Sequence, residues 1–172
     1  MKTLVIFMGP AGVGKSKLVK YIKKRHPQAL VITKRDIELN FPKESREEQN
    51  KKYYENINNM LKIGEYIIVD SNHILRKDRI ELFNSLNINP NDLNIIGVWI
   101  DNSWNHIIEN NSSKPKNEQL DEKTLKYLFD YRSSPESDEP FNDIVYLSLS
   151  AKIGISKTHP CLTDVYTALD KI

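Results

Sequence analysis

The sequence predicts an α/β fold of three layers, in which helices cover both faces of a five-stranded parallel sheet. The chain opens with a continuous apolar run at residues 3–8 that ends at a glycine, which is typical of a strand buried on both faces. Four more short apolar runs follow, and segments with helical periodicity separate them. A glycine-rich loop at residues 9–16 joins the first apolar run to the first helical segment.

The individual elements follow from these patterns in chain order. Strands are predicted at residues 3–8, 29–33, 65–70, 93–101 and 142–149. Helices are predicted at residues 15–26, 43–64, 76–86, 104–110, 121–132 and 163–172. The first helix is expected to pack on the sheet through Leu18, Val19 and Ile22. The long second helix is mostly polar, with an apolar inner face formed by Tyr53, Tyr54, Ile57, Met60 and Leu61.

The composition fits one folded domain that spans residues 1–172. Apolar residues make up 39% of the chain and charged residues 28%, as in ordinary globular proteins. The only cysteine, Cys161, excludes an internal disulfide, and the histidines and cysteine do not have zinc-ligand spacing. No apolar run approaches the length of a membrane span, and the short apolar start fits a buried strand better than a signal peptide. We therefore expect a cytoplasmic protein with no membrane partner.

Charge is distributed unevenly, although the net charge is only +2. Residues 1–63 contain 14 lysines and arginines against 6 acidic residues, whereas residues 64–172 contain 11 against 17. A basic half that includes the glycine-rich loop favours binding of a nucleotide, and also of an anionic acceptor. The alternative is that these lysines and arginines only form solvated helix faces.

The glycine-rich loop carries the strongest functional signal. Gly9-x-x-x-x-Gly14-Lys15-Ser16 fits the phosphate-binding pattern GxxxxGK[ST], between a buried strand and an amphipathic helix. In such a loop backbone N–H groups and the helix N-terminus surround the phosphates of ATP or another nucleoside triphosphate. Lys15 is then expected to reach the β- and γ-phosphates, and Ser16 to bind Mg²⁺. The expected nucleotide-binding residues are Gly9, Ala11, Gly12, Val13, Gly14, Lys15, Ser16 and Lys17.

Two carboxylates follow predicted strands at the edge where parallel α/β sheets bind ligands. Asp36 comes after the second strand and Asp70 ends the third. A kinase needs a carboxylate beside the acceptor hydroxyl to orient it and accept its proton, and Asp36 is the candidate for that role. Asp70 is a candidate for binding the acceptor, or for holding Mg²⁺ through water. Taken alone, either residue could instead be a helix cap or turn residue.

These segments together resemble the 5′-hydroxyl polynucleotide kinases of the phage RNA-repair type. The resemblance rests on GPAGVGKSK, VITKRD, IIVDSN and WNHIIENNSSK, in the same order and spacing over about residues 1–150. It implies a P-loop kinase fold with strand order 2-3-1-4-5, a lid at about residues 110–120, and MgATP-dependent transfer of the γ-phosphoryl group to the 5′-OH of DNA or RNA. It also implies that Asp36 is the general base, and that Arg35, Asp36, Asp70 and Asn72 bind the acceptor.

The sequence departs from this family at two places. The family carries an arginine three residues after the base aspartate, where it grips a phosphate of the acceptor, and this chain has Leu39. Arginines of the family's lid clamp the donor phosphates, whereas this chain has Asn110 and Lys114 at those positions. Lys114 is the expected catalytic lid residue, although a lysine supplies a point charge and not a bidentate fork.

Two other functions remain open from the sequence. Leu39 favours a small-molecule kinase that phosphorylates a nucleoside or metabolite. The third hypothesis is a nucleotide-binding module, or a kinase subunit of a nucleic-acid repair assembly.

Overall fold

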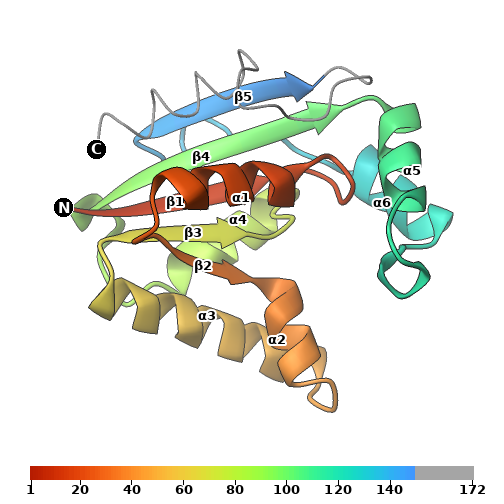
Figure 1. Cartoon of the computed structure of the whole chain (residues 1–172). Coiled ribbons are helices and arrows are strands. Elements are labelled where there is room, and N and C mark those ends of the chain that lie inside the picture. The colour runs from red at the N-terminus through yellow and green to blue at the C-terminus, as the bar shows by residue number, and fades with distance from the viewer. Residues whose placement is uncertain (150–172) are drawn as a thin grey trace.

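The structure is a computed structural model that describes residues 1–149. Five strands form one parallel sheet in this part of the chain, in the order β2-β3-β1-β4-β5 (Figure 1). The strands are β1 (Lys2–Met8), β2 (Leu30–Thr33), β3 (Tyr66–Asp70), β4 (Leu93–Asn102) and β5 (Asp143–Leu149). The predicted fold class and strand order are therefore confirmed.

Helices connect the strands. The α-helices are α1 (Lys15–Arg25), α2 (Lys34–Asn40), α3 (Arg46–Ile63), α4 (Arg76–Asn84), α5 (Trp104–Ser112) and α6 (Glu122–Asp130). Short 3₁₀ segments lie at η1 (Pro90–Asp92) and η2 (Lys116–Glu118). No helix within residues 1–149 is long and apolar enough to cross a membrane. The helix predicted at residues 163–172 and Cys161 lie outside the described residues.

The sequence prediction was wrong about the segment after β2, which contains the separate helix α2. Thr33 begins this helix, because its hydroxyl accepts a hydrogen bond from the backbone N–H of Asp36 at 2.9 Å. Helix α3 then begins at Arg46 and not at residue 43. Its N-cap is Ser45, which accepts from the N–H of Glu48, three residues further on as in a capping box.

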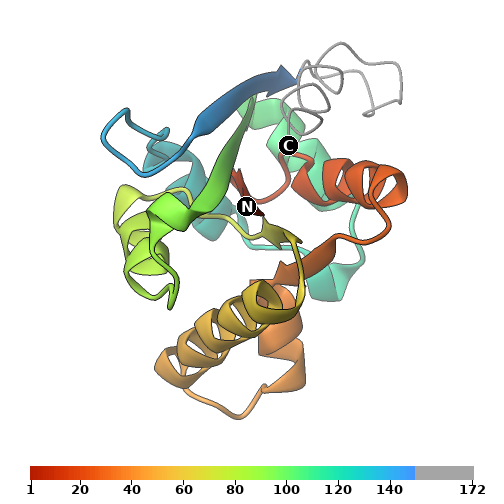
Figure 2. The same cartoon turned by 90° about the vertical axis from the view of Figure 1, so that its left-hand side faces the viewer.

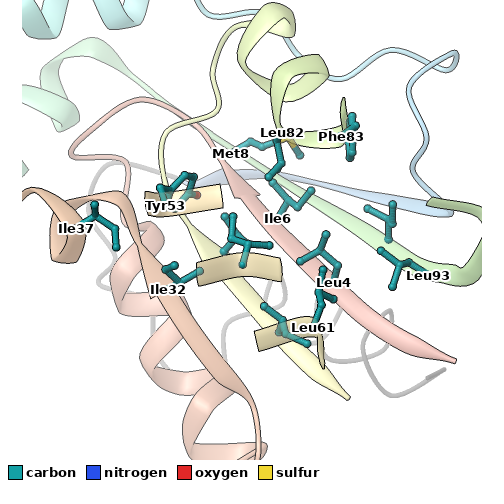
Figure 3. Close-up of a cluster of buried hydrophobic side chains, with 14 of the residues drawn as sticks. Leu4, Ile6, Met8, Ile32, Ile37, Tyr53, Leu61, Leu82, Phe83 and Leu93 are labelled. Atoms are coloured by element: carbon teal, nitrogen blue, oxygen red, sulfur yellow. The ribbon is translucent and has the colours of Figure 1, made fainter. Parts of the chain in front are cut away.

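The alternation of side chains along β1 divides the core into two layers. Val5 and Phe7 pack with the buried face of α1 on one side of the sheet. Leu4, Ile6 and Met8 point to the other side, where they meet α3 and α4 (Figures 2 and 3). From α3 this second layer receives Tyr53, Ile57 and Leu61, and from α4 it receives Leu82 and Phe83.

Strand register brings three loops together at the carboxyl end of the sheet. Phe7 of β1 pairs with Asp70 of β3, and Asp70 in turn pairs with Thr33 of β2. The glycine-rich loop, the start of α2 and the loop after Asp70 therefore emerge side by side. This is the edge at which open α/β sheets bind ligands.

Leu61→Ala tests the core that α3 shares with the sheet. Leu61 is fully buried, so the substitution should lower the free energy of unfolding by about 2–5 kcal/mol through lost contacts and a residual cavity. Urea denaturation gives the comparison. The matched control is Ile63→Ala on the same helix, where the side chain is 82% exposed and the loss should stay within about 0.5 kcal/mol. Equal losses for the two variants would contradict this placement of α3.

Candidate active site

The glycine-rich loop turns tightly between β1 and α1 and packs under β4 and α5. Gly9 has φ 143°, and a Cβ at this position would lie 2.3 Å from the carbonyl oxygen of Ile100. Gly12 has φ 85°, and a Cβ there would lie 3.0 Å from the carbonyl oxygen of Ile107. Both glycines are therefore required by backbone angle and by close approach.

Lys15 and Ser16 link this loop to the end of β3. The buried Lys15 Nζ donates to the carbonyl oxygens of Gly9 and Pro10, at 2.6 and 2.9 Å, and to Asn72 Oδ1 at 3.2 Å. Ser16 Oγ donates to Asp70 Oδ2 at 2.9 Å. A cation, a hydroxyl and a carboxylate thus meet where the phosphate-binding motif predicts them.

Burial opposes charge on both Lys15 and Asp70. Desolvation lowers the pKa of Lys15 to about 8; the nearby Asp70 partly offsets this shift, and the charge of Lys114 adds to it. Desolvation raises the pKa of Asp70, against the opposing effects of Lys15 and the Ser16 hydroxyl, and the negative charge of Asp36 raises it further. A ligand that brings negative charge to Lys15 and a cation to Asp70 would therefore favour the charged form of both residues.

Polar contacts fix the loop that follows Asp70. Ser71 Oγ accepts from the backbone N–H of Lys34 at 3.1 Å and from the hydroxyl of Tyr53 at 2.9 Å. The hydroxyl of Tyr53 also lies 3.0 Å from His73 Nε2. His73 is buried with φ 41°, and burial followed by the charges of Lys34 and Arg79 lowers its pKa to about 3, so its ring is neutral. This histidine holds the loop and does not titrate near neutral pH.

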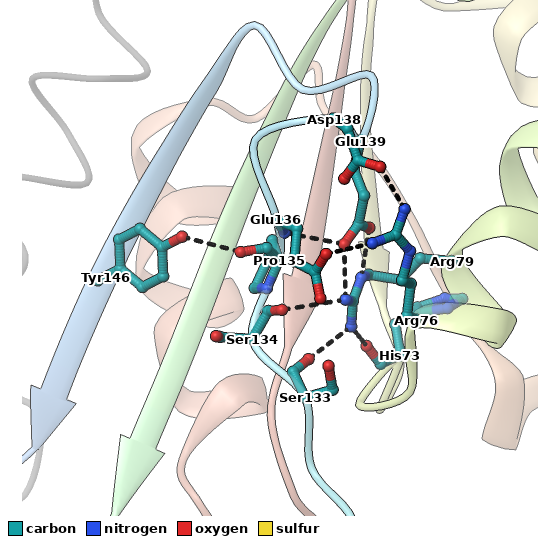
Figure 4. Close-up of polar contacts among 10 residues, drawn as sticks. All are labelled: His73, Arg76, Arg79, Ser133, Ser134, Pro135, Glu136, Asp138, Glu139 and Tyr146. Carbon is teal, nitrogen blue, oxygen red and sulfur yellow. Dashed lines mark hydrogen bonds and ion pairs between the residues drawn. The ribbon is translucent and has the colours of Figure 1, made fainter.

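A buried arginine joins this loop to the chain after α6 (Figure 4). Arg79 Nη1 donates to the carbonyl oxygens of His73 and Ser133, at 3.0 and 2.8 Å. Its Nε and Nη2 form a bidentate pair with Glu139 at 2.7 and 2.8 Å, and the two side chains are 0% and 1% exposed. The sequence does not reveal this pair, because 60 residues separate its members.

A cavity of about 660 Å³ extends from the glycine-rich loop past β3 to α2, α4 and α6. The predicted site residues that line it are Ala11, Gly12, Gly14, Lys15, Ser16, Lys17, Arg35, Asp70, Asn72 and Lys114. Among the described residues, Gly9, Val13 and Asp36 are predicted site residues that do not line it. Gly9 donates its backbone N–H to the carbonyl of Asn72 at 3.0 Å, and Val13 packs into the core.

The orientation of α2 separates two carboxylates. Arg35 and Glu38, three residues apart, share the helix face that lines the cavity. Asp36 is exposed in the first turn, outside that lining, although its charge reaches Asp70. Leu39 is 63% exposed. Glu38 is a candidate that the sequence did not single out, because only the helical phase of α2 places it in the cavity wall.

The predicted lid comprises the end of α5 and the segment that contains η2. Asn110 Nδ2 donates to the carbonyl oxygen of Gly12 at 2.7 Å, so the lid begins against the phosphate loop. Lys114 lines the cavity, whereas the exposed Lys116 does not. Across the opening, Glu118 lies 3.6 Å from Arg35 in an ion pair whose side chains are 43% and 48% exposed.

The residues present fit MgATP. Mg²⁺ is usually held by one or two protein oxygens and by phosphate oxygens, and Ser16 with Asp70 supplies such a pair. The described residues contain no group of three or more histidine, cysteine or acidic side chains able to hold a metal by themselves. The donor set is thus suited to a metal that arrives with a nucleotide.

Comparison with known proteins identifies the family. Residues 2–152 match the family described as chromatin associated protein KTI12. The chain belongs to the KTI12 family. No curated protein matches the sequence. The resemblance to polynucleotide kinases therefore holds for the P-loop kinase fold, and the family is KTI12.

Solved structures share the fold at low sequence identity. Chaetomium thermophilum Kti12 in complex with ADP-AlF3 is 13% identical, with TM-score 0.70, over 98% of this chain and 97% of that one. A fungal RNA kinase is 17% identical, with TM-score 0.67, over 99% of this chain and 84% of that one. A sugar kinase from Janibacter sp. HTCC2649 is 14% identical, with TM-score 0.67, over 99% and 95%. The chain thus has the fold of these P-loop proteins, and its family is KTI12.

The pKa of Lys15 predicts proton uptake when ATP binds. Phosphate oxygens favour the protonated amine, so a pKa of about 8 in the free protein should rise on binding. We expect uptake of about 0.1 proton per ATP at pH 7 and about 0.9 at pH 9. Calorimetry in buffers with different ionisation enthalpies measures it. Uptake should persist in Lys20→Met, and a value that stays flat from pH 7 to 9 would refute the assignment.

Arg79→Met tests the buried ion pair. The substitution leaves the Glu139 carboxylate buried without its bidentate partner, so the free energy of unfolding should fall by about 3–5 kcal/mol. Arg76→Met is the matched control on the same helix, because Arg76 binds Glu136 and Asp138 at the surface. Urea denaturation should show a much larger loss for Arg79→Met, and the reverse order would contradict the model of a buried anchor.

Proposed function

We propose that this KTI12-family protein binds MgATP and transfers its γ-phosphoryl group to a hydroxyl, with the 5′-OH end of a polynucleotide as the leading acceptor. The observation that carries the proposal is the contact of Lys15 and Ser16 with the loop that begins at Asp70, in a cavity of about 660 Å³ whose lining extends to α2, α4 and α6. Donor residues and room for a second substrate thus adjoin each other.

The donor side follows from the motif. Lys15 would hold the β- and γ-phosphates, while Ser16 and Asp70 would hold Mg²⁺, directly or through water. The metal would supply charge neutralisation at the phosphoryl group. Lys114 would add a cation from the lid, which would also exclude water. The similar fold of Kti12 in complex with ADP-AlF3 supports this assignment, because aluminium fluoride takes the place of a phosphoryl group.

The acceptor side would offer cations for phosphate. Apart from the donor residues, the cavity lining contains Lys34, Arg35, Arg46 and Lys77, which would suit the phosphates that follow a 5′-terminal nucleoside, and also the acidic Glu38, Asp78 and Glu81. One of the basic residues would replace the arginine that polynucleotide kinases carry at the position of Leu39. The similar fold of a fungal RNA kinase supports a nucleic-acid acceptor.

A carboxylate of α2 would accept the proton of the hydroxyl. Asp36 matches the base of the polynucleotide kinases, and its charge reaches Asp70. Glu38 instead lies in the wall of the cavity. We assign the base to Asp36, which requires its exposed side chain to turn toward the acceptor when the acceptor binds.

A small-molecule kinase is the second candidate. The exposed Leu39 removes one phosphate contact from the acceptor side, and a sugar kinase shares the fold. In the third candidate, the protein binds nucleotide as a module or kinase subunit of a nucleic-acid repair assembly. These three functions predict different products from the same labelled ATP.

Transfer from labelled ATP in the presence of Mg²⁺ separates the candidates. Oligonucleotides of DNA and RNA with a 5′-OH, free nucleosides and sugars, and a reaction without acceptor would be compared. We expect label on the oligonucleotide, lost with ATP binding in Lys15→Ala. Label only on a small molecule would support the second candidate, and bound ATP with no acceptor labelled would support the third.

Paired variants of α2 test the base. Asp36→Asn should lower the rate of transfer by about 10²–10⁴-fold with ATP affinity retained, whereas Glu38→Gln should have little effect on the rate. The opposite result would move the base to Glu38. Calorimetric titration with ATP shows that each variant still binds the donor.

A further inference from the structure

Two exposed tyrosines lie four residues apart, one on α6 and the other at its C-cap. Tyr127 is 49% exposed and Tyr131 is 62% exposed. Their ring centroids are 4.7 Å apart, with an angle of 34° between the ring planes. The buried core residue of this helix is Leu125. The two rings therefore form an exposed aromatic patch that is not part of the hydrophobic core.

The patch adjoins the acceptor side of the cavity. Tyr127 and its neighbour Leu128 line the same cavity as Lys15 and Asp70. The chain after α6 is tied to the loop that follows Asp70, because the N–H of Ser133 donates to the carbonyl oxygen of Ile74 at 2.7 Å. Tyr127 thus lies in a cavity wall shared with the loop that follows Asp70, where the acceptor is expected.

The surroundings of Tyr127 favour one class of ligand. Arg35, Lys77 and Lys114 line the same cavity as Tyr127, beside the acidic Glu38, Asp78, Glu81 and Glu118, so an aromatic face and cations border one space. Grooves for single-stranded nucleic acid have this combination, in which cations contact the backbone and aromatic rings stack on bases.

We propose that Tyr127 and Tyr131 form a stacking subsite for a nucleobase near the 5′ end of a single-stranded acceptor. The proposal rests on the proposed function and adds to it a contact to the base. Every base has a π face, so the subsite would favour a base over an abasic sugar while discriminating little among the four bases. It would raise acceptor affinity and leave the donor site unchanged.

Binding of short 5′-OH single strands labelled at the 3′ end tests the subsite without requiring turnover. Fluorescence anisotropy would measure the Kd of a fully based strand and of strands that are abasic at the first, second or third nucleotide. We expect Tyr127→Ala and Tyr131→Ala each to weaken binding of the based strand about tenfold. Tyr127→Phe should retain the wild-type Kd, because the ring and not the hydroxyl makes the contact.

The decisive result is coupling between protein and strand. At one position, the abasic strand should bind the wild-type protein about tenfold more weakly than the based strand does. Tyr127→Ala should bind these two strands with nearly the same affinity, because the substitution has already removed the contact that the missing base would make. Tyr146→Ala is the matched control, because Tyr146 is 58% exposed but belongs to β5, and its hydroxyl donates to the carbonyl of Pro135. That variant should bind every strand as the wild type does.

The outcomes separate this inference from the proposed function. Coupled binding without phosphoryl transfer would support the subsite and overturn the kinase assignment. Transfer to the oligonucleotide with no abasic position coupled to Tyr127 would overturn the subsite alone. A protein that binds none of the strands would also overturn the subsite, and the patch would then be a surface for a protein partner.

Discussion

The parallel pairing of β1 with β3 is the constraint on which the site depends. It sets Phe7 opposite Asp70, so the loop after β1 and the loop after β3 leave the sheet together. Gly9 then donates to the carbonyl of Asn72, and Lys15 and Ser16 reach Asn72 and Asp70. A slip of one residue in this register would turn Asp70 to the opposite face and break the contact between phosphate loop and carboxylate.

This arrangement places an amine and a carboxyl group where burial disfavours the charged form of each. Burial lowers the pKa of Lys15 and raises that of Asp70, and each residue partly offsets the shift of the other. Lys15 donates to Gly9, Pro10 and Asn72, and Ser16 donates to Asp70, so phosphate and metal would replace these partners on entering the site. The fold therefore holds this pair at the end of the sheet at a local cost in stability.

Short-range patterns made most of the fold and the donor site predictable. Buried strands read as apolar runs, and the phosphate motif has a fixed spacing, so the sheet order and the Lys15–Ser16 pair followed from sequence and resemblance. Helix α2 did not, because it has seven residues and only Ile37 is buried. Its helical phase decides that Glu38 lies in the cavity wall, and no local pattern reveals that phase relative to the sheet. The phosphate motif led to the P-loop kinase fold, whereas the short motifs around Asp36 and Asp70 pointed to the polynucleotide kinases and did not identify the KTI12 family.

Long-range contacts also determine how firmly the parts of the cleft are held. Arg79 binds the carbonyl of His73 and that of Ser133, so the Asp70 loop and the chain after α6 share one buried anchor. The position of the aromatic rings of α6 relative to Asp70 is thus set by desolvated hydrogen bonds. The lid crosses to α2 through the exposed Arg35–Glu118 pair, and such a pair contributes at most about 1 kcal/mol. The wall formed by the Asp70 loop and the chain after α6 is therefore the firmly held side of the cleft, whereas only a weak ion pair holds the η2 segment to α2.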